Sequence, residues 1–166
     1  MRYLAAAVLM LAVSVADAAA QPVVFLVRHA ERADAGMAAA KVAGADPDLS
    51  GAGLARANSL AAMLKDARLR TVITTEFKRT KQTGGPVATG AGVPLTVIDS
   101  KDVAGLLKKV RASTGNVVVV GHTNTLPEIL KGLGVTEPIT IAEDEYDSLF
   151  VVTRASPPAF VRLRYR

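Results

Sequence analysis

Short apolar runs rich in Val, Ile and Leu recur along the chain. They cover residues 23–27, 71–75, 95–98 and 116–120. Runs of this length without polar alternation are typical of strands buried on both faces of a parallel sheet. The pattern therefore predicts four strands of the parallel-sheet type.

Segments with helical spacing lie between these runs. Leu54, Ala57 and Leu64 fall on one helical face behind Ser50, a residue type that caps helices. Further helices are predicted over 78–88, 103–110 and 126–133. The Gly-Gly-Pro sequence at 84–86 is typical of a helix breaker, so we expect the second helix to be short and loosened there.

Strands and helices alternate, and this order predicts the fold class. A β-α-β-α series gives a mostly parallel sheet with helices on both faces. Two C-terminal strands, 149–153 and 160–165, are joined by a short link and are expected to pair antiparallel. We predict a three-layer α/β/α fold with about six strands, forming a single domain over residues 21–166.

The N-terminal segment differs from the rest of the chain. Arg2 precedes an apolar run over 3–15, and small residues follow up to Ala20, the three-part layout of a secretory signal. We expect residues 1–20 to be a signal peptide cleaved after Ala20, or alternatively after Ala18. The prediction is a periplasmic or secreted protein without stable membrane association after cleavage. An uncleaved anchor is disfavoured because the apolar run is short and rich in Ala.

Charge and composition narrow the ligand class. The formal net charge is +5, which suits anionic ligands. Aromatic residues make up 4% of the chain, and no basic stripe carries interleaved aromatics, so no nucleic-acid partner is expected. The basic tail of Arg162, Arg164 and Arg166 alternates as on one face of a strand. The sequence contains no cysteine, so no disulfide supports the fold.

The two histidines of the sequence both follow predicted strands. His29 stands behind Arg28 at the end of the first strand, and His122 follows the fourth. Carboxyl ends of parallel strands meet at one edge of a sheet, so both imidazoles are expected in one crevice. Arg79 lies about one helical turn beyond the second strand and can reach the same edge. Paired guanidinium donors match phosphate oxygens and repel metal cations, so we predict a phosphoryl ligand and no metal.

Four segments, in order, resemble the motifs of the histidine phosphatase superfamily, the phosphoglycerate-mutase-like proteins, in the short branch-one form. They are Leu26–Glu31, Leu49–Ala57, Thr74–Thr83 and Val120–Thr123. The resemblance implies a phosphoglycerate-mutase-like fold and a metal-independent, cofactor-free phosphatase. It implies that His29 is the nucleophile, forming phosphohistidine, and that Arg28, Arg79 and His122 bind the phosphoryl group.

The proton donor is left open. The family's Glu-bearing insertion is absent after the third strand, and the Asp that follows the second His in the other branch is replaced here by Thr123. Thr123 and Asn124 are candidate phosphate ligands. The carboxylates that remain as candidate acids are Glu31, Asp99, Asp102, the run Glu143-Asp144-Glu145, and Asp147.

The expected substrate is a phosphorylated small molecule or a phosphoprotein, including one that carries phosphohistidine. Two alternatives remain. One is a non-catalytic phosphate-binding or interaction protein of the same fold, which the missing acid favours. The other is a phosphoglycerate-mutase-type phosphotransferase, which the expected export and the lack of lid insertions disfavour.

Overall fold

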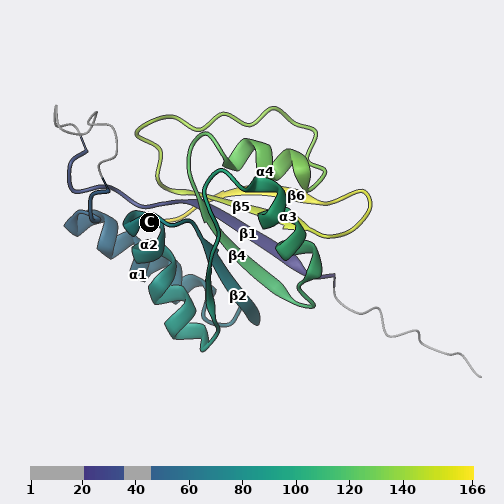
Figure 1. Cartoon of the computed structure of the whole chain (residues 1–166), viewed down its shortest axis with the longest axis horizontal. Coiled ribbons are helices and arrows are strands. Elements are labelled where there is room, and N and C mark those ends of the chain that lie inside the picture. The colour runs from purple at the N-terminus through teal and green to yellow at the C-terminus, as the bar shows by residue number, and fades with distance from the viewer. Residues whose placement is uncertain (1–20, 36–45) are drawn as a thin grey trace, which may run out of the picture.

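The centre of the molecule is a six-stranded sheet with the order β3-β2-β4-β1-β5-β6 (Figure 1). The computed structural model describes residues 21–35 and 46–166, so the predicted signal peptide lies outside the described residues. The strands are β1 (Val23–Arg28), β2 (Leu69–Thr74), β3 (Leu95–Val97), β4 (Asn116–Gly121), β5 (Ser148–Thr153) and β6 (Phe160–Arg164). The first four are mutually parallel, while β5 and β6 run antiparallel to their neighbours. The predicted fold class and the antiparallel C-terminal pair are confirmed.

Two pairs of helices cover the sheet. Helices α1 (Gly51–Leu64) and α2 (Lys78–Ala91) lie on one face, and α3 (Val103–Ala112) and α4 (Leu126–Gly132) on the other (Figure 1). Strand β4 shows why the apolar runs are unbroken. Val117 and Val119 pack toward α3 and α4, whereas Val118 and Val120 pack toward α1 and α2. Successive positions of β4 face the two helical layers in turn, which favours apolar residues at all four of these positions. No helix within the described ranges is both long and apolar enough to cross a bilayer.

The prediction of a broken second helix is wrong. Helix α2 continues through Pro86 to Ala91 and ends at Gly92, whose φ of 64° is left-handed. Gly84 is buried, and a Cβ at this position would lie 2.8 Å from Thr74 Cγ2 and 3.0 Å from Val72 Cγ1. The missing side chain lets α2 lie close against β2, so tertiary packing overrides the low helix propensity of this sequence.

The N-terminus of α1 contacts the segment that follows β1 in the sequence. Ser50 caps the helix as predicted, because its hydroxyl accepts a hydrogen bond from Gly53 N at 3.1 Å. A Cβ at Gly53 would lie 2.3 Å from the carbonyl oxygen of Glu31, so the helix touches this backbone directly. This contact fixes the chain just after His29.

Candidate active site

Three parallel strands bring the predicted site residues to one edge of the sheet. Arg28 is in register with Gly121, and the backbone N–H of His29 donates to the carbonyl of Gly121 at 3.0 Å. The register places His29 and His122 side by side, with ring centroids 5.4 Å apart. Strand β2 ends beside them at Thr74, and Arg79 follows in the first turn of α2.

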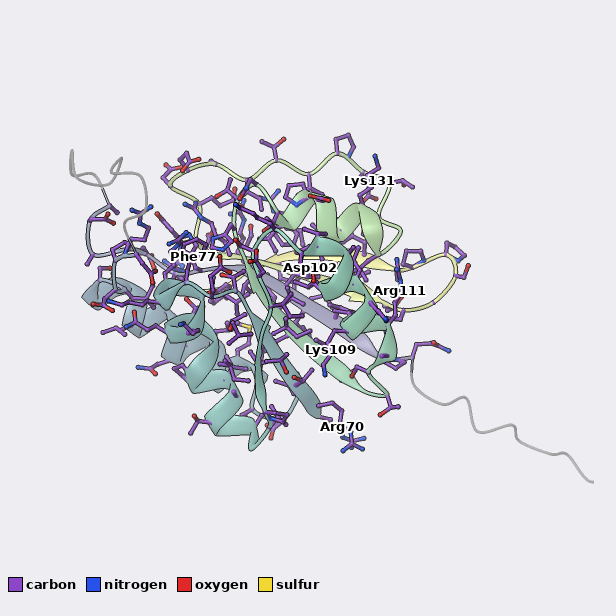
Figure 2. The ribbon with its side chains drawn as sticks, in the orientation of Figure 1. Arg70, Phe77, Asp102, Lys109, Arg111 and Lys131 are labelled. Carbon is purple, nitrogen blue, oxygen red and sulfur yellow. The ribbon has the colours of Figure 1, made fainter. Side chains whose placement is uncertain are left out.

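A cavity of about 520 Å³ opens at this edge. Its lining includes all four residues predicted to bind or attack the phosphoryl group, together with Thr123 and Asn124. The complete set is Arg28, His29, Arg32, Phe77, Arg79, Ser100, Lys101, His122, Thr123, Asn124, Thr125 and Glu143. A groove of similar volume, about 500 Å³, lies beside Arg70 and Lys109 at the opposite end of β2 from Phe77 (Figure 2). No histidine lines that groove, so the chemistry of the lining distinguishes the two cavities.

His29 is held as a neutral imidazole with a defined tautomer. Its Nδ1 lies 2.9 Å from the carbonyl oxygen of Ala30, which can only accept, so Nδ1 carries the proton and Nε2 the lone pair. The ring is 4% exposed. Burial lowers the pKa of His29 to about 3, and the charges of Arg28, His122 and Arg79 act in the same direction. The Nε2 lone pair is therefore available at neutral pH.

Arg28 is anchored on one side and available on the other. Its Nη1 donates to the carbonyl oxygens of Ala142, Glu143 and Glu145 at 3.0, 2.8 and 3.1 Å. The guanidinium carbon lies 4.2 Å from the ring centre of Tyr146. Among residues 21–35 and 46–166, its buried Nε finds no hydrogen-bond partner, and Nη2 makes only long contacts, 3.5 Å to the Tyr146 hydroxyl and 3.7 Å to the Glu143 carboxylate. Arg28 thus offers an oxyanion its Nε/Nη2 edge, not both sides of the fork.

The guanidinium of Arg79 has contacts similar to those of Arg28. Its guanidinium carbon lies 4.2 Å from the ring centre of Phe77, and its buried Nε has no hydrogen-bond partner in the described part of the chain. The Asp46 carboxylate lies 3.7 Å from Nη1 and also accepts a hydrogen bond from Lys78 N at the start of α2. A buried donor that finds no acceptor costs about 1–3 kcal/mol. Both arginines line the cavity, so their guanidinium groups are placed to donate to an anion bound there.

His122 is fixed by contacts on several sides. Its Nε2 lies 3.0 Å from the Thr75 hydroxyl, its backbone N–H donates to the Thr125 hydroxyl at 3.1 Å, and Phe77 packs edge-on against its ring. Burial lowers the pKa of His122 to about 4, as does the charge of Arg79, and Glu76 opposes the shift. Both imidazoles of the site are therefore neutral at pH 7.

The four carboxylates at Glu31, Asp99, Asp102 and Asp147 lie outside this lining, and each has another partner. Burial acts to raise the pKa of Glu31, but hydrogen bonds from Arg56 outweigh it and the pKa is lowered. Asp102 caps α3 through Gly105 N, Asp99 accepts from Lys101 N, and Asp147 pairs with Arg164. Of the acidic run, Glu143 is the one carboxylate among the described residues that lines the cavity.

Several lining residues have no counterpart in the sequence analysis. Phe77 and Lys101 line the cavity from connecting segments whose path no local pattern encodes. The Tyr146 ring contacts Arg28 but is not part of this lining. Thr75 is the last residue of the predicted strand 71–75, and this position was the available indication. No group of three or more His, Asp or Glu side chains suited to a metal ion occurs in the described part of the chain.

Comparison with known proteins identifies a similar family and a similar fold. The model of the histidine phosphatase superfamily (branch 1) matches residues 24–104. The protein histidine phosphatase SixA complexed with tungstate superposes with a TM-score of 0.67 at 21% identity, covering 86% of this chain and 96% of that one. A mycobacterial glucosyl-3-phosphoglycerate phosphatase complexed with VO3 gives 0.66 at 12% identity, covering 87% and 98%. No curated protein matches significantly in sequence. At these identities the superpositions establish the fold.

Proposed function

Because the chain belongs to branch 1 of the histidine phosphatase superfamily, we propose that it is an exported phosphatase. It hydrolyses phosphomonoesters, or phosphohistidine on a protein, through a phosphohistidine on His29. One observation carries the proposal: His29, whose Nε2 holds the lone pair, lines the same cavity as the guanidinium groups of Arg28 and Arg79. The similar solved structures named as phosphatases support it.

The reaction follows from the available atoms. His29 Nε2 attacks phosphorus, the N–P bond forms, and the P–O bond to the leaving alcohol breaks as that oxygen takes up a proton. Water then attacks phosphorus, the N–P bond breaks, and inorganic phosphate and a neutral His29 are regenerated. Arg28 and Arg79 stabilise the negative charge that spreads over the equatorial oxygens. The low pKa of His29 keeps the nucleophile unprotonated.

Turnover is tested with wild type and His29→Asn on a panel of phosphomonoesters and a phosphohistidine peptide, with EDTA present. Lys109→Ala, in the distant groove, is the matched control for a change that leaves the site intact. We expect wild type and the control to hydrolyse substrates and to form acid-labile phosphoprotein, and His29→Asn to do neither. If wild type turns over nothing on the panel, the phosphatase proposal fails.

The same experiment separates the alternatives. A phosphate-binding protein without catalysis would show a rise in melting temperature with vanadate but no product. A phosphotransferase would return an isomeric phosphoester instead of inorganic phosphate. Activity lost in EDTA and restored by a divalent cation would contradict metal independence.

Export is proposed from the layout of residues 1–20, a basic start, an apolar run and small residues up to Ala20. N-terminal sequencing of protein recovered from the periplasm or medium tests it. The mature chain is expected to begin at Gln21. Recovery of full-length protein from the cytoplasm alone would contradict export.

A further inference from the structure

We propose that Thr75 and Thr80 form a buried hydroxyl relay that fixes the tautomer of His122 and makes its Nδ1 the atom that exchanges a proton with the phosphoryl group. The tautomer follows from hydrogen-bond geometry alone, whereas the role of Nδ1 rests on the proposed phosphatase function. Both threonines are buried, with exposed fractions of 4% and 0%. Each hydroxyl carries one proton and can donate one hydrogen bond, so the donor and the acceptor of every bond in the relay can be assigned.

The relay is anchored at Thr80. Its hydroxyl oxygen lies 2.8 Å from the carbonyl oxygen of Phe77 and 3.1 Å from that of Thr75. A carbonyl oxygen has no proton to give, so the Thr80 proton must point to one of these carbonyls. Its third contact, 2.9 Å to the Thr75 hydroxyl, must then be a bond that Thr80 accepts.

The remaining bonds follow in sequence. Thr75 uses its only proton on Thr80 and presents a lone pair to His122 Nε2 at 3.0 Å. Two lone pairs at that distance repel, so Nε2 must carry a proton and donate it to Thr75. Nδ1 of His122 makes no hydrogen bond to the described residues and is not among the buried unpartnered atoms, so it is the nitrogen open to the cavity.

The two histidines therefore have opposite tautomers. His29 holds its proton on Nδ1, toward Ala30, and offers Nε2 to phosphorus. His122 holds its proton on Nε2, toward Thr75, and offers Nδ1. The charged and titratable groups that act on His122 are Arg79, Arg28, Glu76 and His29.

A phosphoryl dianion changes the protonation of His122. The negative charge of the dianion favours the imidazolium form of His122. Nδ1 therefore takes up a proton from solvent and donates a hydrogen bond to a phosphoryl oxygen. As the P–O bond breaks, this proton passes to the departing oxygen. In the second step the attacking water gives a proton back to Nδ1. His122 would thus supply the proton transfer for which the cavity lining holds no carboxylate except the exposed Glu143.

Nitrogen-15 NMR of the labelled full chain tests the tautomers directly. Long-range ring correlations distinguish the protonated nitrogen, and the sequence has only two histidines. His29→Asn removes one set of signals and so assigns both. We expect Nδ1–H for His29 and Nε2–H for His122 at pH 7, and both nitrogens of His122 protonated when vanadate is added. Nδ1–H for the unliganded His122, or an equal mixture of tautomers, overturns the relay.

Variants of Thr75 test its positioning role. Thr75→Val removes the acceptor for His122 Nε2, Thr75→Ser keeps it, and Thr71→Val is the matched control because its buried hydroxyl contacts the Pro94 carbonyl at the other end of β2. Loss of one orienting hydrogen bond is expected to lower the kcat of Thr75→Val about tenfold. The variant should also lose the single Nε2–H signature of His122. Thr75→Ser and Thr71→Val should retain both.

The outcomes distinguish a positioning role of Thr75 from a purely structural one, and the relay from the phosphatase proposal. Equal losses in Thr75→Val and Thr71→Val, or no rescue by Thr75→Ser, contradict a positioning role. If Thr75→Val does not fold, the tautomer of His122 in the wild type and the kcat of Thr75→Ser still test the positioning role of Thr75. A wild type with the expected tautomers but no turnover leaves the relay standing and rejects the phosphatase proposal.

Discussion

Adjacent glycines in α2 provide a matched pair for testing how this helix is held against the sheet. We predict that Gly84→Ala destabilises the protein relative to Gly85→Ala. A Cβ at Gly84 meets Thr74 Cγ2 at 2.8 Å and Val72 Cγ1 at 3.0 Å, whereas a Cβ at Gly85 meets nothing within 4 Å. The contacted atoms belong to buried β-branched side chains, which have little rotamer freedom.

The magnitude follows from two opposed contributions. Replacing Gly by Ala inside a helix stabilises it by about 1 kcal/mol where no proline follows, as at Gly84. Overpacking at Gly84 costs about 1–3 kcal/mol because α2 must move away from β2. Because Gly85 precedes Pro86, whose ring disfavours a Cβ in helical backbone at position 85, the helix-propensity gain is smaller there and partly offsets the difference. The free energy of unfolding of Gly84→Ala should still be lower, by about 1–2 kcal/mol.

Activity provides a second readout. Arg79 lies in the first turn of α2, and Thr83 accepts a hydrogen bond from Ala30 N, beside His29. A displacement of about 1 Å in a catalytic group can lower the rate about 100-fold, so kcat/KM should fall in Gly84→Ala and stay unchanged in Gly85→Ala. Urea unfolding and steady-state kinetics measure both effects. Equal stability and activity in the two variants would refute the close packing of α2 on β2.

Three further outcomes follow from the site. Because the folded-state pKa values of His29 and His122 lie near 3 and 4, below the ordinary 6.5, the unfolded chain takes up protons first as pH falls. Urea unfolding should therefore show stability decreasing from pH 6.5 to 4, by about 1.4 kcal/mol per pH unit for each histidine, and an unchanged slope in His29→Asn would contradict this. Glu31→Gln should lower the free energy of unfolding by about 1 kcal/mol through loss of the half-buried Arg56 pair, with kcat unchanged. A selective loss of kcat toward alkyl phosphates would instead identify Glu31 as the acid. Glu143→Gln should change kcat/KM by less than about fivefold, because an exposed ion pair contributes at most about 1 kcal/mol. A much larger loss on poor leaving groups would assign the proton donor to Glu143 and not to His122.

The sheet was predictable because each central strand is covered on both faces. Val117 to Val120 must all be apolar, which leaves an unbroken run in the sequence. The convergence of His29 and His122 was predictable for a related reason, since parallel pairing of β1 with β4 places their carboxyl ends together.

Other features depend on contacts that local sequence does not encode. From the sequence alone, Gly84 resembles a helix breaker. In the fold its missing side chain leaves room for the side chains of Thr74 and Val72 on β2, and this contact is not visible in the local sequence. The partner of Glu31 is a side chain distant in sequence, Arg56, and no motif marks this pairing.

The position of Arg28 depends on main-chain contacts and not on the side chains of the residues that hold its Nη1. Its Nη1 is held by main-chain oxygens of residues 142, 143 and 145, which any amino acid supplies. The side chains of that loop can therefore be exchanged during evolution without releasing the guanidinium. The chemistry of the cavity rim can thus change while the Arg28 guanidinium keeps its position in the lining.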